Sequence, residues 1–115
     1  MIINPNSNGY CLVRELQPAA TFWQRWRGLM GRASLPEGSG LLISPCRSVH
    51  TMHMRFPIDV IFLDRAWTVV GLEPSLRPWR FSRNYPSAWF AIELPAGTIQ
   101  ASGTEIGHRL QCAAD

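Results

Sequence analysis

A run of soft metal ligands lies in the middle of the chain, between Cys46 and Met54. In an extended segment alternate side chains share one face, so Cys46, His50, Met52 and Met54 would line the same side. Thiolate, imidazole and thioether groups are the ligands that Cu(I) prefers. Methionine also fills irregular gaps in a core, and six extended residues already span about 20 Å, too far for both ends to hold one ion. The pattern therefore predicts a packing role and no metal site, with His50, Met52 and Met54 as secondary candidates for a soft metal.

Two carboxylates lie within otherwise apolar segments that are predicted to be strands. Asp59 is in the run 58–63, and Glu93 is in the run 88–94. A buried carboxylate must find hydrogen-bond donors or an ion pair, or its pKa rises. Asp59 would then be a general base, an anchor for a polar ligand, a partner of an arginine, or an acceptor for backbone N–H groups. An acid–base site would form if Asp59 and Glu93 approached each other beside His50 or His53. The candidate catalytic residues are Asp59, Glu93 and His50.

Arginine and aromatic residues are interleaved between Arg77 and Tyr85. Such a loop can stack nucleic-acid bases, form the edge of a protein interface, or pack its tryptophan inward with its arginines in solvent. The candidate binding residues of the chain are Arg55, Asp59, Arg77, Trp79 and Arg80. The sequence contains neither a glycine-rich phosphate loop nor a GxSxG motif, which favours binding over catalysis.

All eleven basic residues are arginines, and the net charge is +3 with a pI of about 9.1. This mild excess favours anionic partners without requiring them. The arginines are spread along the chain, and only Arg77, Arg80 and Arg83 are close in sequence, so a nucleic-acid partner is not expected. The expected partner is a small ligand or a protein.

The elements that must position these residues are short. Periodicity predicts one amphipathic helix over residues 21–30 and a short second helical segment over 98–102. Strands are predicted at 10–16, 41–43, 58–63, 67–72, 88–94 and 108–112, and residues 49–54 are predicted to be extended. A chain of 115 residues with nine glycines and nine prolines fits one domain, residues 1–115, with tight turns. The predicted fold class is mainly β: a small antiparallel β-sandwich or partly closed barrel with the amphipathic helix at one end.

The N-terminal residues lack the basic start and the apolar run of a secretory signal. No stretch approaches the roughly 18 apolar residues that a membrane span needs. The three cysteines, Cys11, Cys46 and Cys112, are odd in number and form no CxxC pair. These features predict a cytoplasmic protein with reduced thiols.

Four motifs follow one another in a specific order. They are RGLMGR at 27–32 with Leu35 and GLL at 40–42, VHTMHMRFPIDVIFLD at 49–64, LRPWR at 76–80, and IELPAGT at 92–98 with Gly103 and Gly107. In this order they resemble the domain of unknown function 192 family over residues 12–110. The resemblance implies a small, mostly β fold, no established activity and no cofactor. It suggests a bacterial protein, and many relatives look exported.

The most regular residues of that family correspond to Gly28, Leu29, Met30, Met54, Pro57, Asp59, Glu93 and Gly97. Several of them are typical of backbone and packing constraints, such as Gly97 in a turn. The chain departs from the family at two turns. Trp67 and Thr68 stand where an acidic residue and glycine are usual, which suggests a longer or rearranged hairpin, and His108 stands where an aspartate is usual.

The sequence therefore predicts a non-enzymatic binding or accessory module. Its small ligand or protein partner would dock against residues 50–59 and the loop 77–85. The alternative is an enzyme or a metal-handling protein, with copper as the model soft metal, that uses His50, Asp59 and Glu93 with Met52 or Met54. A third possibility is binding of nucleic acid by the loop 77–83 alone, which would have to weaken as salt rises.

Overall fold

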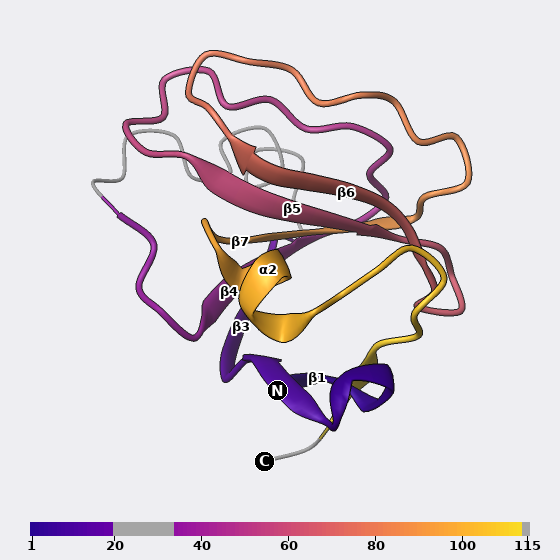
Figure 1. Cartoon of the computed structure of the whole chain (residues 1–115). Coiled ribbons are helices and arrows are strands. Elements are labelled where there is room, and N and C mark those ends of the chain that lie inside the picture. Colours follow the sequence, from indigo (N-terminus) through magenta and orange to yellow (C-terminus); the bar gives the residue numbers. More distant parts are fainter. Residues whose placement is uncertain (20–33, 114–115) are drawn as a thin grey trace.

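A computed structural model describes residues 1–19 and 34–113 of the chain. The predicted helix over residues 21–30 lies outside these described residues. In chain order the elements are β1 (Ile2–Asn4), the short 3-10 helix η1 (Pro5–Ser7), β2 (Tyr10–Val13), β3 (Glu15–Ala19), β4 (Ser39–Ile43), β5 (Ile58–Leu63), β6 (Val69–Leu76), β7 (Phe90–Pro95), α2 (Thr98–Ser102) and β8 (Gln111–Cys112). Figure 1 shows α2 between the strands of the larger sheet and the N-terminal strand β1.

The strands form two sheets, with the orders β2-β1-β8 and β3-β4-β7-β5-β6. This arrangement confirms the prediction of a mainly β fold, and within the described residues neither sheet closes into a barrel. The expectation that all strands pair antiparallel is wrong for one pair, because β3 and β4 are parallel. Parallel neighbours need a long crossover, and residues 20–38 supply the chain length for it.

The predicted first strand, 10–16, is two strands that belong to different sheets. β2 pairs with β1 of the smaller sheet, whereas β3 pairs with β4 of the larger one. The change occurs at Arg14, where the N–H groups of Arg14 and Glu15 both donate to the carbonyl of Gly38, at 2.7 and 3.1 Å. Alternation of apolar residues continues through this corner, so the pattern alone does not reveal it.

Other predicted elements fare differently. The strand 58–63 and the helix 98–102 are confirmed at both ends. The prediction of an extended segment over residues 49–54 is wrong, because only His50 makes an isolated bridge, to Phe81. The cause is Thr51, whose backbone and side chain bond a distant loop and whose carbonyl accepts a turn hydrogen bond from the N–H of Met54 at 3.2 Å.

The hairpin between β5 and β6 keeps a tight turn. Asp64 Oδ1 accepts hydrogen bonds from the N–H groups of Ala66 and Thr68, both at 2.9 Å. Trp67 adopts a φ of 66°, a conformation that favours glycine. The departure from the family pattern at Trp67 therefore leaves a left-handed turn residue in place, and its ring packs against Phe90 with centroids 5.4 Å apart. The second strand of the hairpin, β6, begins at Val69 and reaches Leu76, later than the predicted 67–72.

The core lies on both faces of the larger sheet, because β5 is buried on both sides. Ile58, Val60 and Phe62 contribute to one buried cluster, which also contains Met54. The opposite cluster contains Ile61 and Leu63 of β5 together with residues of the smaller sheet, such as Ile2, Leu12 and Val13. The two sheets therefore pack against each other through this second cluster. In the described part of the chain, no helix has the length and apolar character to cross a membrane.

The ring of Tyr85 lies directly over the backbone of Gly71 in β6. A Cβ atom at position 71 would overlap the Tyr85 ring, which itself packs on Phe62 with centroids 4.4 Å apart. We expect Gly71→Ala to lower the free energy of unfolding by about 1–3 kcal/mol, because the ring must move. Urea denaturation of the variant measures this loss.

The control for Gly71→Ala is the same substitution made in a Tyr85→Ala background. With the ring absent, the added methyl group meets no obstacle and the loss should largely disappear. An equal loss in both backgrounds would show that the ring is not the cause.

Candidate functional site

Asp59 is a buried structural acceptor near the start of β5, rather than a surface group. Its Oδ1 accepts a hydrogen bond from the N–H of Ser75, and its Oδ2 accepts one from the N–H of Ile99, both at 2.8 Å. The side chain is 1% exposed. Of the roles open to it in the sequence, the geometry matches acceptance from backbone N–H groups, and it joins the far end of β6 to the first turn of α2.

Glu93 is also buried, but it lies on the opposite face of the sheet. In the pairing of β5 with β7, Asp59 is opposite Leu94 and Val60 is opposite Glu93. Directly paired residues share a face and successive residues alternate, so the Asp59 and Glu93 carboxylates point away from each other. The structure therefore does not bring together the two carboxylates of the predicted acid–base site.

Each carboxylate oxygen of Asp59 accepts a hydrogen bond from one backbone N–H group, so replacing one oxygen tests its role as a structural acceptor. In Asp59→Asn the amide retains one acceptor oxygen and turns its NH₂ toward the second N–H. We expect the free energy of unfolding to fall by about 1–3 kcal/mol. Urea denaturation measures the loss, and faster hydrogen exchange at the amides of Ser75 and Ile99 locates it.

Asp64→Asn is the matched control, because a single oxygen of Asp64 accepts both of its hydrogen bonds. An asparagine can keep both bonds, so this variant should be close to neutral. Equal losses in the Asp59 and Asp64 variants would contradict the assigned role of Asp59.

Two segments that are far apart in the sequence form one structural unit, which we call the joined loops: residues 47–55 and 77–85. Figure 1 shows both running along the same side of the larger sheet. Thr51 is at their centre: its N–H donates to the carbonyl of Arg80 at 2.8 Å, and its carbonyl accepts from the N–H of Trp79 at 2.9 Å. Its buried hydroxyl donates to the carbonyl of Arg77 at 2.5 Å and accepts from the N–H of Arg80 at 2.8 Å.

Further bonds continue this pairing on the side of Thr51 toward residues 47 and 85. Val49 and Ser82 bond in both directions, each at 2.9 Å, one through backbone groups and one through the Ser82 hydroxyl. The N–H of Tyr85 donates to the carbonyl of Arg47 at 2.8 Å. The loops are therefore held by a ladder of hydrogen bonds although neither contains a regular strand.

The joined loops concentrate the positive charge of the chain. They contain five arginines and no acidic residue, whereas the rest of the chain has six arginines against eight acidic residues, a net charge of −2. All five arginines are exposed: Arg47, Arg55, Arg77, Arg80 and Arg83. Between them Phe81 is 72% exposed and Trp79 is 53% exposed, and the Trp79 ring contacts the ring of His53 edge-on with centroids 4.6 Å apart.

Glu73 of β6 holds the end of the joined loops that contains Arg83 and Tyr85. Its Oε2 accepts hydrogen bonds from the N–H of Arg83 at 2.8 Å and from the hydroxyl of Tyr85 at 3.0 Å. Burial raises the pKa of Tyr85, and the hydrogen bond to the Glu73 carboxylate and its charge raise it further, so the phenol remains a donor at neutral pH. Sequence reasoning did not identify Thr51, Glu73 or Arg47 as part of this unit, because their partners are distant in the sequence and the spacing carries no local signal.

The secondary metal candidates have different surroundings. Met54 is buried in the core cluster with Ile58, and His50 Nδ1 accepts a hydrogen bond from the N–H of Met52 at 3.2 Å. The thiol of Cys46 donates to the carbonyl of Ser48 at 3.0 Å. Among the described residues no three His, Cys, Asp or Glu side chains are close enough to hold one metal ion.

Removing the Thr51 hydroxyl tests whether it holds the joined loops. Thr51→Val preserves the shape of the side chain but leaves the Arg77 carbonyl and the Arg80 N–H without this partner. We expect a loss of about 1–2 kcal/mol in the free energy of unfolding, with faster hydrogen exchange at the Arg80 amide. Thr51→Ser, which keeps the hydroxyl, should remain nearer the parent protein, and equal losses in the two variants would contradict this assignment.

The fold and this unit together define a class: a small two-sheet β protein that presents a basic and aromatic loop surface. Within it, the chain belongs to the domain of unknown function 192 family, described as "Uncharacterized ACR", whose model matches residues 3–112. The match confirms the resemblance seen in the ordered motifs and extends beyond both ends of the expected core, 12–110.

Relatives agree with this assignment. The chain is 36% identical over 114 residues to a UPF0127 protein of Thermococcus sibiricus, covering 96% of this chain and 73% of that one. It is 38% identical over 102 residues to a UPF0127 protein of Pyrococcus furiosus, covering 84% and 85%. These relatives are archaeal, which contradicts the expectation of a bacterial protein.

A solved structure shows the same fold. It is a protein of unknown function from Novosphingobium aromaticivorans, with a TM-score of 0.85 and 18% sequence identity, and the alignment covers 96% of this chain and 83% of that chain. At this level of identity the likeness concerns the fold alone.

Proposed function

We propose that the protein is a single-domain, non-enzymatic binding or accessory module whose joined loops dock an acidic segment of a protein partner. The observation that carries the proposal is the composition of this surface: five exposed arginines, no acidic residue, and two exposed aromatic rings between them. Tryptophan and arginine are enriched at the energetic centres of protein interfaces. The candidate binding residues Arg55, Arg77, Trp79 and Arg80 all belong to the joined loops, whereas Asp59 supports the fold from within.

Charge distribution favours a short acidic segment over a long polyanion. Opposite charge would steer an acidic partner to the joined loops. Outside the joined loops the sequence has six arginines against eight acidic residues, so the excess positive charge that a long polyanion would need belongs to the loops alone. Cys11, Cys46 and Cys112 form no disulfide in the described chain, which supports a reducing compartment such as the cytoplasm.

The alternative of an enzyme or soft-metal site requires convergence of the candidate residues. Asp59 is on one face of the sheet, whereas Met54 packs in the cluster on the other face. The backbone N–H groups of Ser75 and Ile99 already engage both oxygens of Asp59. A single site that uses Asp59 together with Glu93 and Met54 is therefore not supported.

A defined acidic polypeptide tests the proposal even though the natural partner is unidentified. The probe is a labelled random copolymer of glutamate and tyrosine, compared with polyglutamate and with an oligothymidylate by fluorescence anisotropy. We expect the copolymer to bind more tightly than either control. Its affinity should fall as the salt concentration rises. Trp79→Ala and Phe81→Ala should each weaken binding by about tenfold or more, because such anchors contribute well over 1 kcal/mol.

Matched controls lie outside the joined loops. Ile106 is an exposed apolar residue and Arg109 an exposed arginine, so Ile106→Ala and Arg109→Ala should leave binding unchanged. Tighter binding of the oligothymidylate at equal salt would replace the proposal with a single-stranded nucleic acid partner. Absence of copolymer binding at low salt, or binding that the Trp79 and Phe81 variants do not alter, would overturn it.

A further inference from the structure

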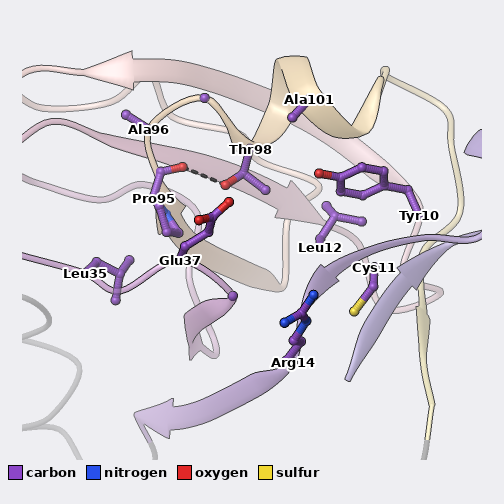
Figure 2. Close-up of a pocket in the computed structure, with 12 residues that line it drawn as sticks. Tyr10, Cys11, Leu12, Arg14, Leu35, Glu37, Pro95, Ala96, Thr98 and Ala101 are labelled. Atoms are coloured by element: carbon purple, nitrogen blue, oxygen red, sulfur yellow. Dashed lines mark hydrogen bonds between the residues drawn. The ribbon is translucent and has the colours of Figure 1, made fainter.

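A hollow of about 580 Å³ lies away from the joined loops, between three segments of the chain. Its walls come from β2, from the turn at residues 35–38 and from the turn that leads from β7 into α2. Figure 2 shows three polar groups directed into it from different sides: the Arg14 guanidinium, the Glu37 carboxylate and the Tyr10 hydroxyl. The volume is within the range of roughly 300–1,000 Å³ that is usual for small-molecule sites.

Backbone interactions hold the two charged residues near each other. The Gly38 carbonyl accepts from the N–H groups of Arg14 and Glu15, and Gly38 has a φ of 84°. The Arg14 side chain lies along Gly38, since a Cβ atom there would be 3.7 Å from its Cδ atom. Glu37 immediately precedes this glycine, so the corner between the two sheets also brings Glu37 to the hollow.

The opposite wall is also fixed. The hydroxyl of Thr98 donates to the carbonyl of Pro95 at 2.7 Å (Figure 2), and the next residue, Ile99, donates its N–H to the buried Asp59. Leu12 and Leu35, both buried, contribute apolar surface to the lining. The hollow thus has ordered walls, a polar rim of both signs and an apolar part, which is the composition of a preorganised ligand site.

The charges within the hollow define the class of ligand. Within the described chain, neither Arg14 nor Glu37 forms an ion pair. A simple anion would be attracted by Arg14 and repelled by Glu37, and a simple cation would meet the reverse. Only a ligand that carries both charges gains from both residues and is repelled by neither.

We propose that this hollow binds a short zwitterion, a free amino acid or a dipeptide. Its carboxylate faces the Arg14 guanidinium and its ammonium group faces the Glu37 carboxylate, with an apolar side chain against Leu12 and Leu35. Arginine suits this role because its planar group can bind a carboxylate through two parallel hydrogen bonds. The site uses no residue of the joined loops, so it is independent of the proposed docking function.

Isothermal titration calorimetry with leucine and with alanyl-leucine tests the site. We expect a Kd between about 1 μM and 1 mM for at least one of them. Arg14→Gln and Glu37→Gln should each weaken binding by about tenfold or more, because each removes one charged partner. Both residues are exposed, so neither variant should unfold the protein, and Glu105→Gln and Arg109→Gln are controls with exposed charges elsewhere.

Blocked dipeptides assign each charge to its residue. N-acetyl-alanyl-leucine lacks the ammonium group and should bind weakly, with an affinity that Glu37→Gln does not change further. Alanyl-leucine amide lacks the carboxylate, so it should bind weakly, and Arg14→Gln should not change its affinity further. This pattern is the coupling expected when ligand group and side chain interact directly.

Cys11 provides a readout that does not depend on heat. Cys11 is one of the residues that line the hollow, and its thiol donates to the carbonyl of Val13 at 3.5 Å, whereas Cys112 is exposed and lies outside the hollow. A bound zwitterion should slow alkylation of Cys11 by iodoacetamide and leave the rate at Cys112 unchanged, as followed by peptide mass spectrometry.

Three results would overturn the proposal. The first is no heat and no protection of Cys11 with either probe at about 10 mM, beyond the weakest affinity that a specific site would show. The second is equal binding of the blocked and unblocked dipeptides. The third is binding that Arg14→Gln and Glu37→Gln leave unchanged.

Discussion

The carboxylate of Asp59 connects three elements that are far apart in the sequence. It lies in β5, accepts from Ser75 at the end of β6, and accepts from Ile99 in the first turn of α2. Removal of a carboxylate from water is unfavourable unless donors replace the water, and here two backbone N–H groups do so. The same bonds satisfy the backbone N–H groups of Ser75 and Ile99. The wall of the hollow beside α2 depends directly on this interaction.

The two sites that we propose share no residue. One face of the larger sheet packs against the smaller sheet and α2, near which the hollow forms. The other face carries the core cluster that contains Met54 and Ile58, together with Tyr85 and Glu73, which hold the joined loops. The electrostatic character of the two sites also differs. The joined loops carry five positive charges with no acidic residue, whereas the lining of the hollow contains one arginine and one glutamate that form no ion pair within the described residues. Partners of different charge are therefore directed to different sides.

Two errors of the sequence prediction, at residues 49–54 and 10–16, share one physical cause. Residues 49–54 alternate like a strand, but Thr51 bonds with residues 77–80 and Met54 turns into the core, so the segment does not pair regularly. The apolar and polar residues of 10–16 also alternate as in one strand, but the chain passes from one sheet to the other at Arg14. There the carbonyl of Gly38 accepts hydrogen bonds from the N–H groups of Arg14 and Glu15. In both cases a partner more than 20 residues away decides the local conformation. Local periodicity reports which side chains are apolar and does not report which backbone groups meet.

The sequence by itself determined the mainly β class, the strand 58–63, the helix 98–102 and the family, because apolar runs, turn residues and ordered motifs are local properties. It also located the arginines and aromatic residues of the loop 77–85 as a candidate surface. The tertiary structure decided the rest. It joined the segment that carries Arg47 and Arg55 to the loop that carries Arg77, Arg80 and Arg83. It also placed Asp59 and Glu93 on opposite faces of the sheet and brought Arg14 and Glu37 to one hollow. These juxtapositions depend on strand register and on pairing between distant segments, and a shift of one residue in a strand reverses the face of every side chain in it.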